Sequence, residues 1–283
     1  MRLGVDSLPA LPKDTTDRNR TSPFAFTGNK FEFRSLGSSN SVSGPNITLN
    51  TIVAEELSKI ADTLEIRLNE GEEWSKAVGE VIRDTINAHK RIIYNGNNYS
   101  KEWIAEAKTR GLLNLRTTPD ALPHFVAKKN IDLYTKHHVF TETEMRSRNE
   151  IHFESYYKVE MIEARTMVDM INKDILPSVI GYKRELAESV IASNQIGLDS
   201  ALEMQLADEI NHKLMALNTA HKSLIAAIES ADKIGDWENR SYYIRDGLIP
   251  AMDKARAAVD ELEVIVGREH WCYPTYSELL FSI

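Results

Sequence analysis

Apolar residues recur at a helical spacing through most of this chain, from about residue 47 to about residue 266. In the first long segment the residues near one stripe are Ile52, Leu57, Ile60, Leu64 and Leu68. A period of 3.6 residues places such positions on one face of an α-helix, so the pattern predicts amphipathic helices rather than strands. Short connections between long helices favour antiparallel packing. We therefore predict a mainly α-helical protein built around a helical bundle.

Capping residues and prolines locate several helix boundaries. Ser100 is the predicted N-cap of a helix that follows it, and Thr118 is the predicted N-cap of another. The segment TETE at 141–144 has the form of a capping box and predicts a long helix behind it. Pro177 and Pro250 are predicted to kink or break two of the long helices, because proline removes a backbone donor and its ring clashes with the preceding turn.

Two further long helices are predicted over residues 198–231 and 237–266. The inward positions of the first are Leu202, Leu206, Ile210, Leu214 and Leu217. The aromatic and apolar tail that follows residue 269 is expected to dock on the bundle. We find no internal repeat in the sequence.

The first fifty residues differ in composition, because glycine, proline, serine and asparagine occur in them repeatedly. They leave room only for short extended segments near 24–26 and 30–34. In the segment NKFEFR, charged residues alternate with Phe31 and Phe33. The side chains of a strand alternate between its two faces, so we predict one charged face and one buried phenylalanine face.

The charged residues of this region suggest chemistry for an anionic ligand. Arg20, Lys30 and Arg34 are residue types that match phosphate oxygens, and Glu32 offers a hard oxygen ligand for Mg²⁺ or Mn²⁺. A surface strand with cross-strand ion pairs is the alternative, and spacing alone favours it.

Composition excludes several classes of function. The formal charge of the 283 residues is −8, which argues against nucleic-acid or anionic-membrane binding. Residues 1–34 nevertheless carry a net charge of +2, consistent with an anionic ligand near that end. Cys272 is the single cysteine, and we find neither a signal peptide nor an apolar run long enough to cross a bilayer. We therefore expect a cytoplasmic protein with no membrane partner.

The eight histidines do not form a zinc-binding pattern. Glu209 and His212 form one Glu-x-x-His pair, which is half of a di-iron signature, but we find no second pair and favour a solvated helix face. His137 and His138 are interpreted as partners of a helix C-terminus. Cys272 is interpreted as a packed apolar residue.

Several of these segments together resemble the carboxy-terminal signature of type III glutamine synthetases. The segments are NRTSPFAFTGNKFEFR, GSSNSVSGPN, YNGNNYS and TTPDALP, and the similarity spans nearly all of the chain. The resemblance implies short N-terminal strands from the end of an α+β catalytic domain, followed by helices. It divides the chain into a catalytic-domain portion over 1–140 and a helical C-terminal domain over 141–283.

Members of this family ligate ammonia to glutamate with ATP, through γ-glutamyl phosphate and divalent metals. By resemblance, Glu32 ligates Mg²⁺ or Mn²⁺, and Arg34 is the catalytic residue that holds the substrate carboxylate and the developing phosphoryl group. Arg20 and Lys30 contact the phosphates of ATP. Family members form homo-oligomeric rings.

The chain departs from the family pattern in length, and Glu32 is its only expected metal ligand. Because a two-metal phosphoryl-transfer site needs more carboxylates, we expect a C-terminal fragment that is inactive without the missing N-terminal half. A split subunit, a truncated gene and a partial record are all compatible with the sequence. The alternative function is a non-catalytic helical interaction or oligomerisation module derived from the enzyme.

Overall fold

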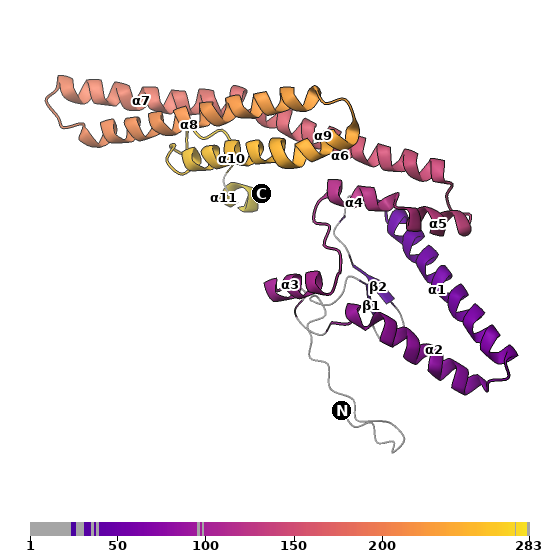
Figure 1. The fold of residues 1–283 in the computed structure, drawn as a ribbon. Helices are drawn as coiled ribbons and strands as arrows, with labels where there is room; N and C mark the ends of the chain where they lie inside the picture. Colours follow the sequence, from indigo (N-terminus) through magenta and orange to yellow (C-terminus); the bar gives the residue numbers. More distant parts are fainter. Residues whose placement is uncertain are drawn as a thin grey trace, which may run out of the picture. The chain divides into compact units, whose positions relative to one another are not determined.

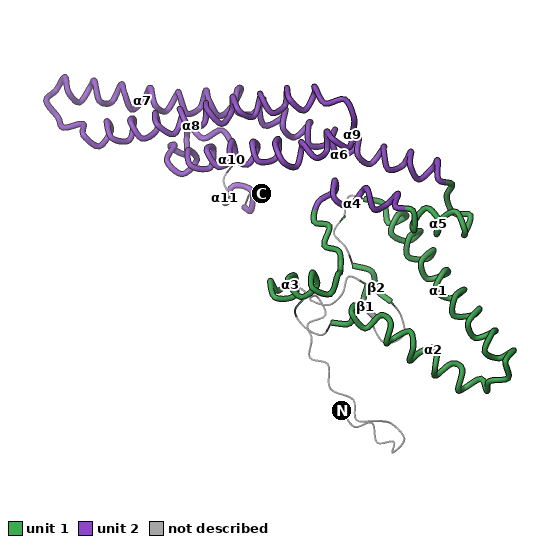
Figure 2. Tube along the Cα trace, in the orientation of Figure 1, with its two compact units in different colours: residues 1–116, 128–141 green, residues 117–127, 142–283 purple. Residues whose placement is uncertain are grey.

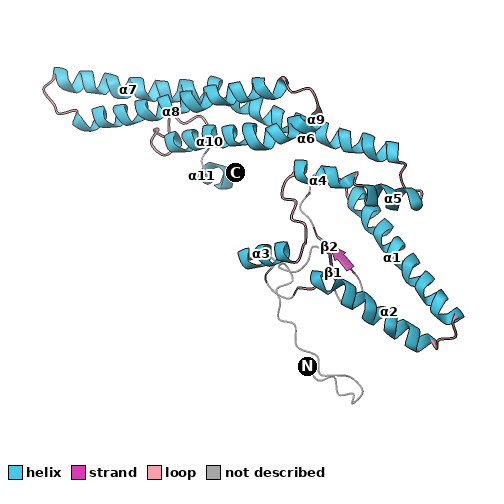
Figure 3. Cartoon of the chain, in the orientation of Figure 1, coloured by secondary structure: helices cyan, strands magenta, loops and turns pink. Residues whose placement is uncertain are grey.

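The structure is a computed structural model that describes residues 24–26, 31–34, 37, 40–94, 97, 99–274 and 276–281. Most of these residues are helical, as Figure 3 shows. The strands within the described ranges are β1 (Phe24–Phe26) and β2 (Phe31–Phe33). The prediction of a mainly α-helical chain with short strands near its N-terminal end is confirmed.

The chain divides into two compact units, which Figure 2 distinguishes by colour. Unit 1 comprises residues 1–116 and 128–141, and unit 2 comprises residues 117–127 and 142–283. Each unit is described by itself below. The functional division into 1–140 and 141–283 stays a prediction.

Unit 1 contains the β1–β2 hairpin and helices that differ widely in length. These helices are α1 (Ser43–Asn69), α2 (Trp74–His89), a 3₁₀ turn (Lys90–Ile92), α3 (Lys101–Thr109) and α5 (Lys128–Lys136). Ser100 caps α3 as predicted, because its side chain accepts a hydrogen bond from the Trp103 N–H at 3.1 Å. Arg67 near the end of α1 holds α2 beside it by donating to Glu80 at 2.6 Å and to Asp84 at 3.2 Å.

Unit 2 is helical, and α6, α7 and α8 are its longest helices. Its helices are α4 (Thr118–Phe125), α6 (Glu142–Met170), α7 (Leu176–Gln195), α8 (Ala201–Asp232), α9 (Trp237–Tyr243), α10 (Ile249–Glu263) and α11 (Tyr276–Phe281). Helix α8 packs against both α7 and α10, and the three run side by side in Figure 1. The hydrophobic core cluster of the described residues lies between these helices and α6.

The sequence predicted a kink or a break at each proline. The chain instead stays helical through both of them. A π-helical turn, Ile171–Ile175, precedes Pro177, and a second one, Ile244–Leu248, precedes Pro250. In the first, the Leu176 N–H bonds to the carbonyl five residues back, and the second turn repeats this pattern. The wider turn accommodates the proline ring where an α-helical turn would clash with it, so the chain stays helical.

The two π turns share a sequence pattern that sequence analysis missed, INKDILP and IRDGLIP. In each, the first and fifth residues are buried, and these residues are Ile171, Ile175, Ile244 and Leu248. Both turns therefore add apolar side chains to the core and also admit a proline. The motif is a local repeat within unit 2.

Several single-residue predictions need correction. Thr117, not Thr118, caps α4, because the Thr117 hydroxyl accepts from the Asp120 N–H at 3.4 Å. Ile210 and Leu217 are buried as predicted, but Leu202 is 76% exposed in the first turn of α8. The helical period places Leu202 on the inward stripe, but it does not tell where the neighbouring helix ends.

The tail docks on the bundle in part. Trp271 and Tyr273 pack against the core cluster, and the Tyr273 hydroxyl donates to Asp174 at 2.9 Å. Cys272 between them is exposed, so its interpretation as a packed apolar residue was wrong. Neighbouring residues in an extended segment point to opposite sides, which explains why Cys272 faces solvent while its neighbours do not.

Buried His221 on α8 predicts a pH dependence of stability. Its Nε2 atom has no hydrogen-bond partner within the described part of the chain, and burial lowers the pKa of the imidazole. The unfolded chain therefore binds more protons than the folded chain below about pH 6.5, and stability is lost as the pH falls through that value. We expect urea midpoints of the wild type to fall between pH 7.5 and 5.5, and those of His221→Leu to fall less.

The control for this prediction is His212→Leu, because His212 is exposed on the same helix. It should reproduce the wild-type change with pH. An equal pH dependence in the wild type and His221→Leu would show that other groups cause it.

Candidate phosphate- and metal-binding strand

The candidate site lies on the hairpin formed by β1 and β2. The strands are antiparallel, with Phe24 opposite Phe33, Ala25 opposite Glu32 and Phe26 opposite Phe31. The rings of Phe24 and Phe31 stack with centroids 4.9 Å apart. Alternation of charged and aromatic residues therefore produces two faces on β2, as the sequence predicted.

Glu32 and Arg34 form an ion pair along this strand. The Arg34 Nη2 donates to the Glu32 Oε2 at 2.5 Å, and both side chains are partly buried. A contact between side chains two residues apart requires that they share a face, which the strand provides. The ion pair that sequence analysis kept as an alternative is therefore present. A metal ion that binds the same Glu32 oxygen has to compete with Arg34.

The other two predicted phosphate contacts are not placed by the structure. Arg20 and Lys30 lie outside the described residues. Their grouping with Glu32 and Arg34 stays a prediction that rests on their neighbourhood in the sequence.

The phenylalanine face of β2 is exposed, contrary to prediction. Phe31 is 61% exposed and Phe33 is 44% exposed. A two-stranded hairpin supplies only one layer, and its apolar face is buried only when another layer packs on it. Within the described part of unit 1, no such layer covers these rings.

The residues that the structure describes offer single candidates for metal ligation rather than a cluster. Among the described residues, no three His, Cys, Asp or Glu side chains come together in a way that could hold a metal ion. His212 is exposed and its Nδ1 lies 2.9 Å from the Asp208 carbonyl, so the Glu209–His212 pair fits the solvated face that we favoured. Glu32 has the chemistry of one hard-cation ligand, and a two-metal centre needs further carboxylates.

A charged contact of unit 1 escaped sequence analysis. Glu55 on α1 lies 2.8 Å from the Lys136 ammonium and 2.7 Å from the His137 imidazole, at the end of α5. Hydrogen bonds from both partners lower the pKa of Glu55 to about 2. His137 was interpreted as a partner of its own helix terminus, but it holds α5 to α1 together with a Thr48–Tyr134 hydrogen bond of 2.7 Å. The residues are about 80 positions apart, so no local signal reveals the contact.

Comparison with known proteins extends the similarity over the whole chain. A family model described as glutamine synthetase C-terminal domain matches residues 77–194. A type-3 glutamine synthetase of Dictyostelium discoideum is 39% identical over 287 residues, covering 99% of this chain and 39% of the relative. A glutamine synthetase of Butyrivibrio fibrisolvens is 37% identical over 275 residues, covering 96% of this chain and 39% of the relative.

The chain is similar to the carboxy-terminal part of glutamine synthetases. A further relative, a glutamine synthetase of Bacteroides fragilis, is 32% identical over 288 residues and covers 100% of this chain. The chain spans about two fifths of the length of these curated relatives. The resemblance of the strand signature to this family is thus confirmed, while the roles of individual residues stay predictions.

A search of the described helices for a membrane-spanning segment finds none with the required length and apolar character.

Proposed function

We propose that this chain forms the C-terminal part of a glutamine synthetase, which ligates ammonia to glutamate with ATP through γ-glutamyl phosphate. The observation that supports this most is the similarity to glutamine synthetases at 32–39% identity over 96–100% of the chain. The family model for the C-terminal domain matches independently of the strand signature, because its residues 77–194 lie beyond β2.

In this proposal the charged face of β2 lines one wall of the active site. Glu32 would hold Mg²⁺ or Mn²⁺, which when bound neutralises negative charge on the transferred phosphoryl group. The Arg34 guanidinium would donate to the glutamate carboxylate and to the phosphoryl oxygens, since its planar fork matches both anions. Arg20 and Lys30 would contact the phosphates of ATP.

The ion pair between Glu32 and Arg34 supports these roles electrostatically. The 2.5 Å contact holds the two side chains in place on one strand face. A divalent cation at Glu32 would compete with Arg34 for the same carboxylate oxygen, and the Arg34 guanidinium would remain on the same strand face as a donor for a substrate anion.

The proposal also covers the oligomeric assembly and the cellular compartment of the enzyme. We propose a homo-oligomeric ring in which the remaining part of the enzyme supplies the other metal ligands and the nucleotide pocket. We propose the cytoplasm as the compartment, since Cys272 alone cannot form an intrachain disulfide.

A second candidate is a helical interaction or oligomerisation module without catalysis. The observation in its favour is that the core cluster lies entirely in unit 2, whereas Glu32 and Arg34 lie in unit 1. A unit with its own core is stable without the site residues and suits an interaction role.

Activity of the purified chain, alone and after mixing, tests the proposed function. Alone, the chain should show no γ-glutamyl transfer and no ATP- and ammonia-dependent phosphate release, since one carboxylate does not make a two-metal site. Mixed with the part of the Dictyostelium relative that lies outside the matched 287 residues, it should restore both activities. Turnover by the isolated chain would contradict the proposed incomplete site, and a stable but inactive mixture would favour the interaction module.

A further inference from the structure

Exposed apolar side chains gather at the end of the hairpin that α7 and α8 form in unit 2. They are Ile191, Ile196, Leu198, Leu202 and Met204, each between 56% and 76% exposed, and we call them the apolar tip. Single exposed apolar residues are normal on a protein surface, but five large ones within a stretch of 14 residues are not. A surface of this kind is typical of an interaction site.

The apolar tip lies beyond the hydrophobic core of unit 2. The core cluster and the side chains packed against it include Leu186 on α7 and Leu206 on α8, and none between these two residues of the described chain. In Figure 1 the end of the hairpin extends past α10, so α10 does not cover it. Packing of the core therefore does not account for the apolar character of the tip.

The loop between the two helices holds the tip in one conformation. The Leu198 N–H donates to the Ser193 carbonyl at 2.9 Å and the Gly197 N–H to the Asn194 carbonyl at 3.3 Å, which is the pattern of a Schellman C-cap. Gly197 has the positive φ of 74° that this cap requires. The residue after the glycine often packs on an apolar residue at the position of Ser193, and the serine leaves Leu198 exposed. An ordered loop lowers the entropic cost of binding a partner.

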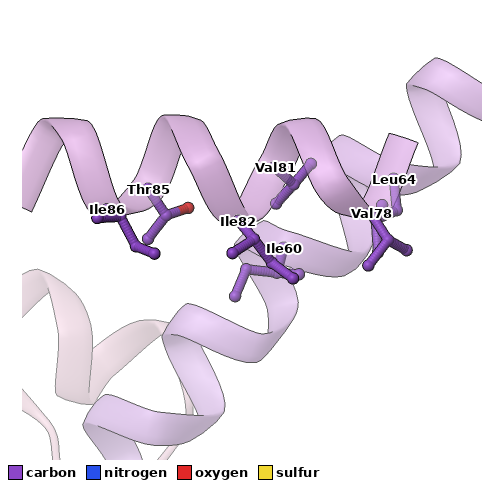
Figure 4. A pocket seen from close by; sticks show the side chains of 7 residues that line it. All are labelled: Ile60, Leu64, Val78, Val81, Ile82, Thr85 and Ile86. Atoms are coloured by element: carbon purple, nitrogen blue, oxygen red, sulfur yellow. The ribbon is translucent and has the colours of Figure 1, made fainter. Parts of the chain in front are cut away.

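The charge around the apolar tip is of one sign. Residues 185–212 contain six acidic residues and neither lysine nor arginine, a formal charge of −6. Asp199 lies in the loop itself and is exposed. The apolar pocket that Figure 4 shows between α1 and α2 of unit 1 differs, because Arg67 pairs with Glu80 and Asp84 on the same two helices. The tip, unlike that pocket, can therefore select a partner by charge.

This charge discriminates between kinds of partner. A second copy of the tip would place like charges face to face, which costs affinity. An anionic lipid surface would be repelled for the same reason. A polypeptide segment that carries both apolar and basic side chains complements both features of the tip. Amphipathic helices use this combination to bind apolar surfaces that contain flexible methionine.

We propose that the apolar tip is a docking surface for a basic amphipathic helix of another protein. Apolar side chains of that helix would pack on Ile196, Leu198 and Leu202, and its lysine or arginine side chains would face Asp199. Docking at the tip uses no residue of β2 and is therefore independent of glutamine synthesis. It gives unit 2 a role that its core alone does not provide.

Fluorescence anisotropy of a labelled peptide, titrated with the full chain, tests the docking surface. The probe is a synthetic helix of about five turns, with leucine on one face and lysine on the other, and a second peptide has glutamate in place of lysine. The wild-type chain should bind the lysine peptide and not the glutamate peptide.

Substitutions in the tip separate the apolar and the charged contributions. Ile196→Ser and Leu202→Ser should each weaken binding of the lysine peptide at least about tenfold, because each removes apolar contact area. Asp199→Asn should weaken it about two- to fivefold, and by less at high salt, because exposed charge pairs are weak and screened.

The matched controls change the same residue types elsewhere in unit 2. Ile162→Ser on α6 removes an isoleucine that is 65% exposed, and Asp253→Asn on α10 removes an exposed charge. Both should bind the lysine peptide as the wild type does, and circular dichroism should show equal helicity in all variants. Equal losses in the controls and the tip variants would show that binding follows overall acidity, and the docking surface would then be wrong.

The remaining outcomes also decide the matter. Failure of the wild type to bind the lysine peptide, or wild-type affinity in both serine variants of the tip, overturns the docking surface. Equal binding of the glutamate peptide overturns the preference for a basic partner. Sedimentation velocity without peptide and flotation with phosphatidylserine-containing vesicles test the other occupants. If the tip variants lost self-association or vesicle binding but kept peptide binding, the tip would belong to a second copy or to a membrane instead.

Discussion

Glu32→Ala should abolish glutamine synthesis by the reconstituted enzyme while the complex stays intact. We expect γ-glutamyl transfer and ATP-dependent phosphate release to fall by on the order of 100-fold or more, since loss of a group that stabilises charge in the transition state has effects of this size. Glu32 is on a three-residue strand and is not part of the core cluster, so its removal should leave association unchanged.

A metal titration separates this role from a structural one. Glu32→Asp keeps the hard oxygen but shortens the side chain, so we expect activity to be recovered in part at raised Mg²⁺ or Mn²⁺ concentration. Glu56→Ala, an exposed carboxylate on α1, is the control and should retain full activity. Retention of activity in Glu32→Ala would contradict the assigned metal role.

The parts of the fold that depend on neighbouring residues in the sequence were predictable. Ser100 caps α3 because a hydroxyl and an N–H three residues later meet within one turn. The alternation in β2 likewise follows from adjacent residues. The π turns before Pro177 and Pro250 also carry a local pattern, an apolar pair four residues apart followed by a proline, but it becomes informative only beside the structure.

The parts that depend on distant residues were not predictable. Glu55 and His137 are 82 positions apart, and nothing in the sequence near either one indicates the other. Phe31 and Phe33 were predicted to be buried because alternation identifies an apolar face, but alternation does not tell whether a second layer is present to cover it. The prediction that Leu202 is buried was wrong for the same reason, since burial depends on whether another element packs against the residue.

The resemblance to a known family identified the candidate site more clearly than the spacing of its charged residues did. Spacing alone favoured an ion pair between Glu32 and Arg34, and the structure contains that pair. A catalytic interpretation of the same residues depends on the family and on charges that the rest of the enzyme would contribute. The pocket between α1 and α2 could not be found from the sequence, because its residues look like any inward stripe of an amphipathic helix.

Leu248→Ala should destabilise unit 2 strongly. Leu248 is fully buried in the core cluster, in a π turn that packs against α6, α8 and α10. The packing near it is tight, since a Cβ atom added to neighbouring Gly247 would lie 2.9 Å from the ring of Tyr243. Truncation of a buried leucine removes apolar contacts and creates a cavity, which costs about 2–5 kcal/mol of the free energy of unfolding.

Leu202→Ala is the matched control for this substitution. Leu202 belongs to the same unit and has the same side chain, but it is 76% exposed on α8, so its truncation should cost about 0.5 kcal/mol or less. Urea unfolding followed by circular dichroism at 222 nm measures both free energies. If the two variants lost equal stability, the π turn would not contribute to the core as its burial indicates. The π turn would then serve only to accommodate the proline in the helix.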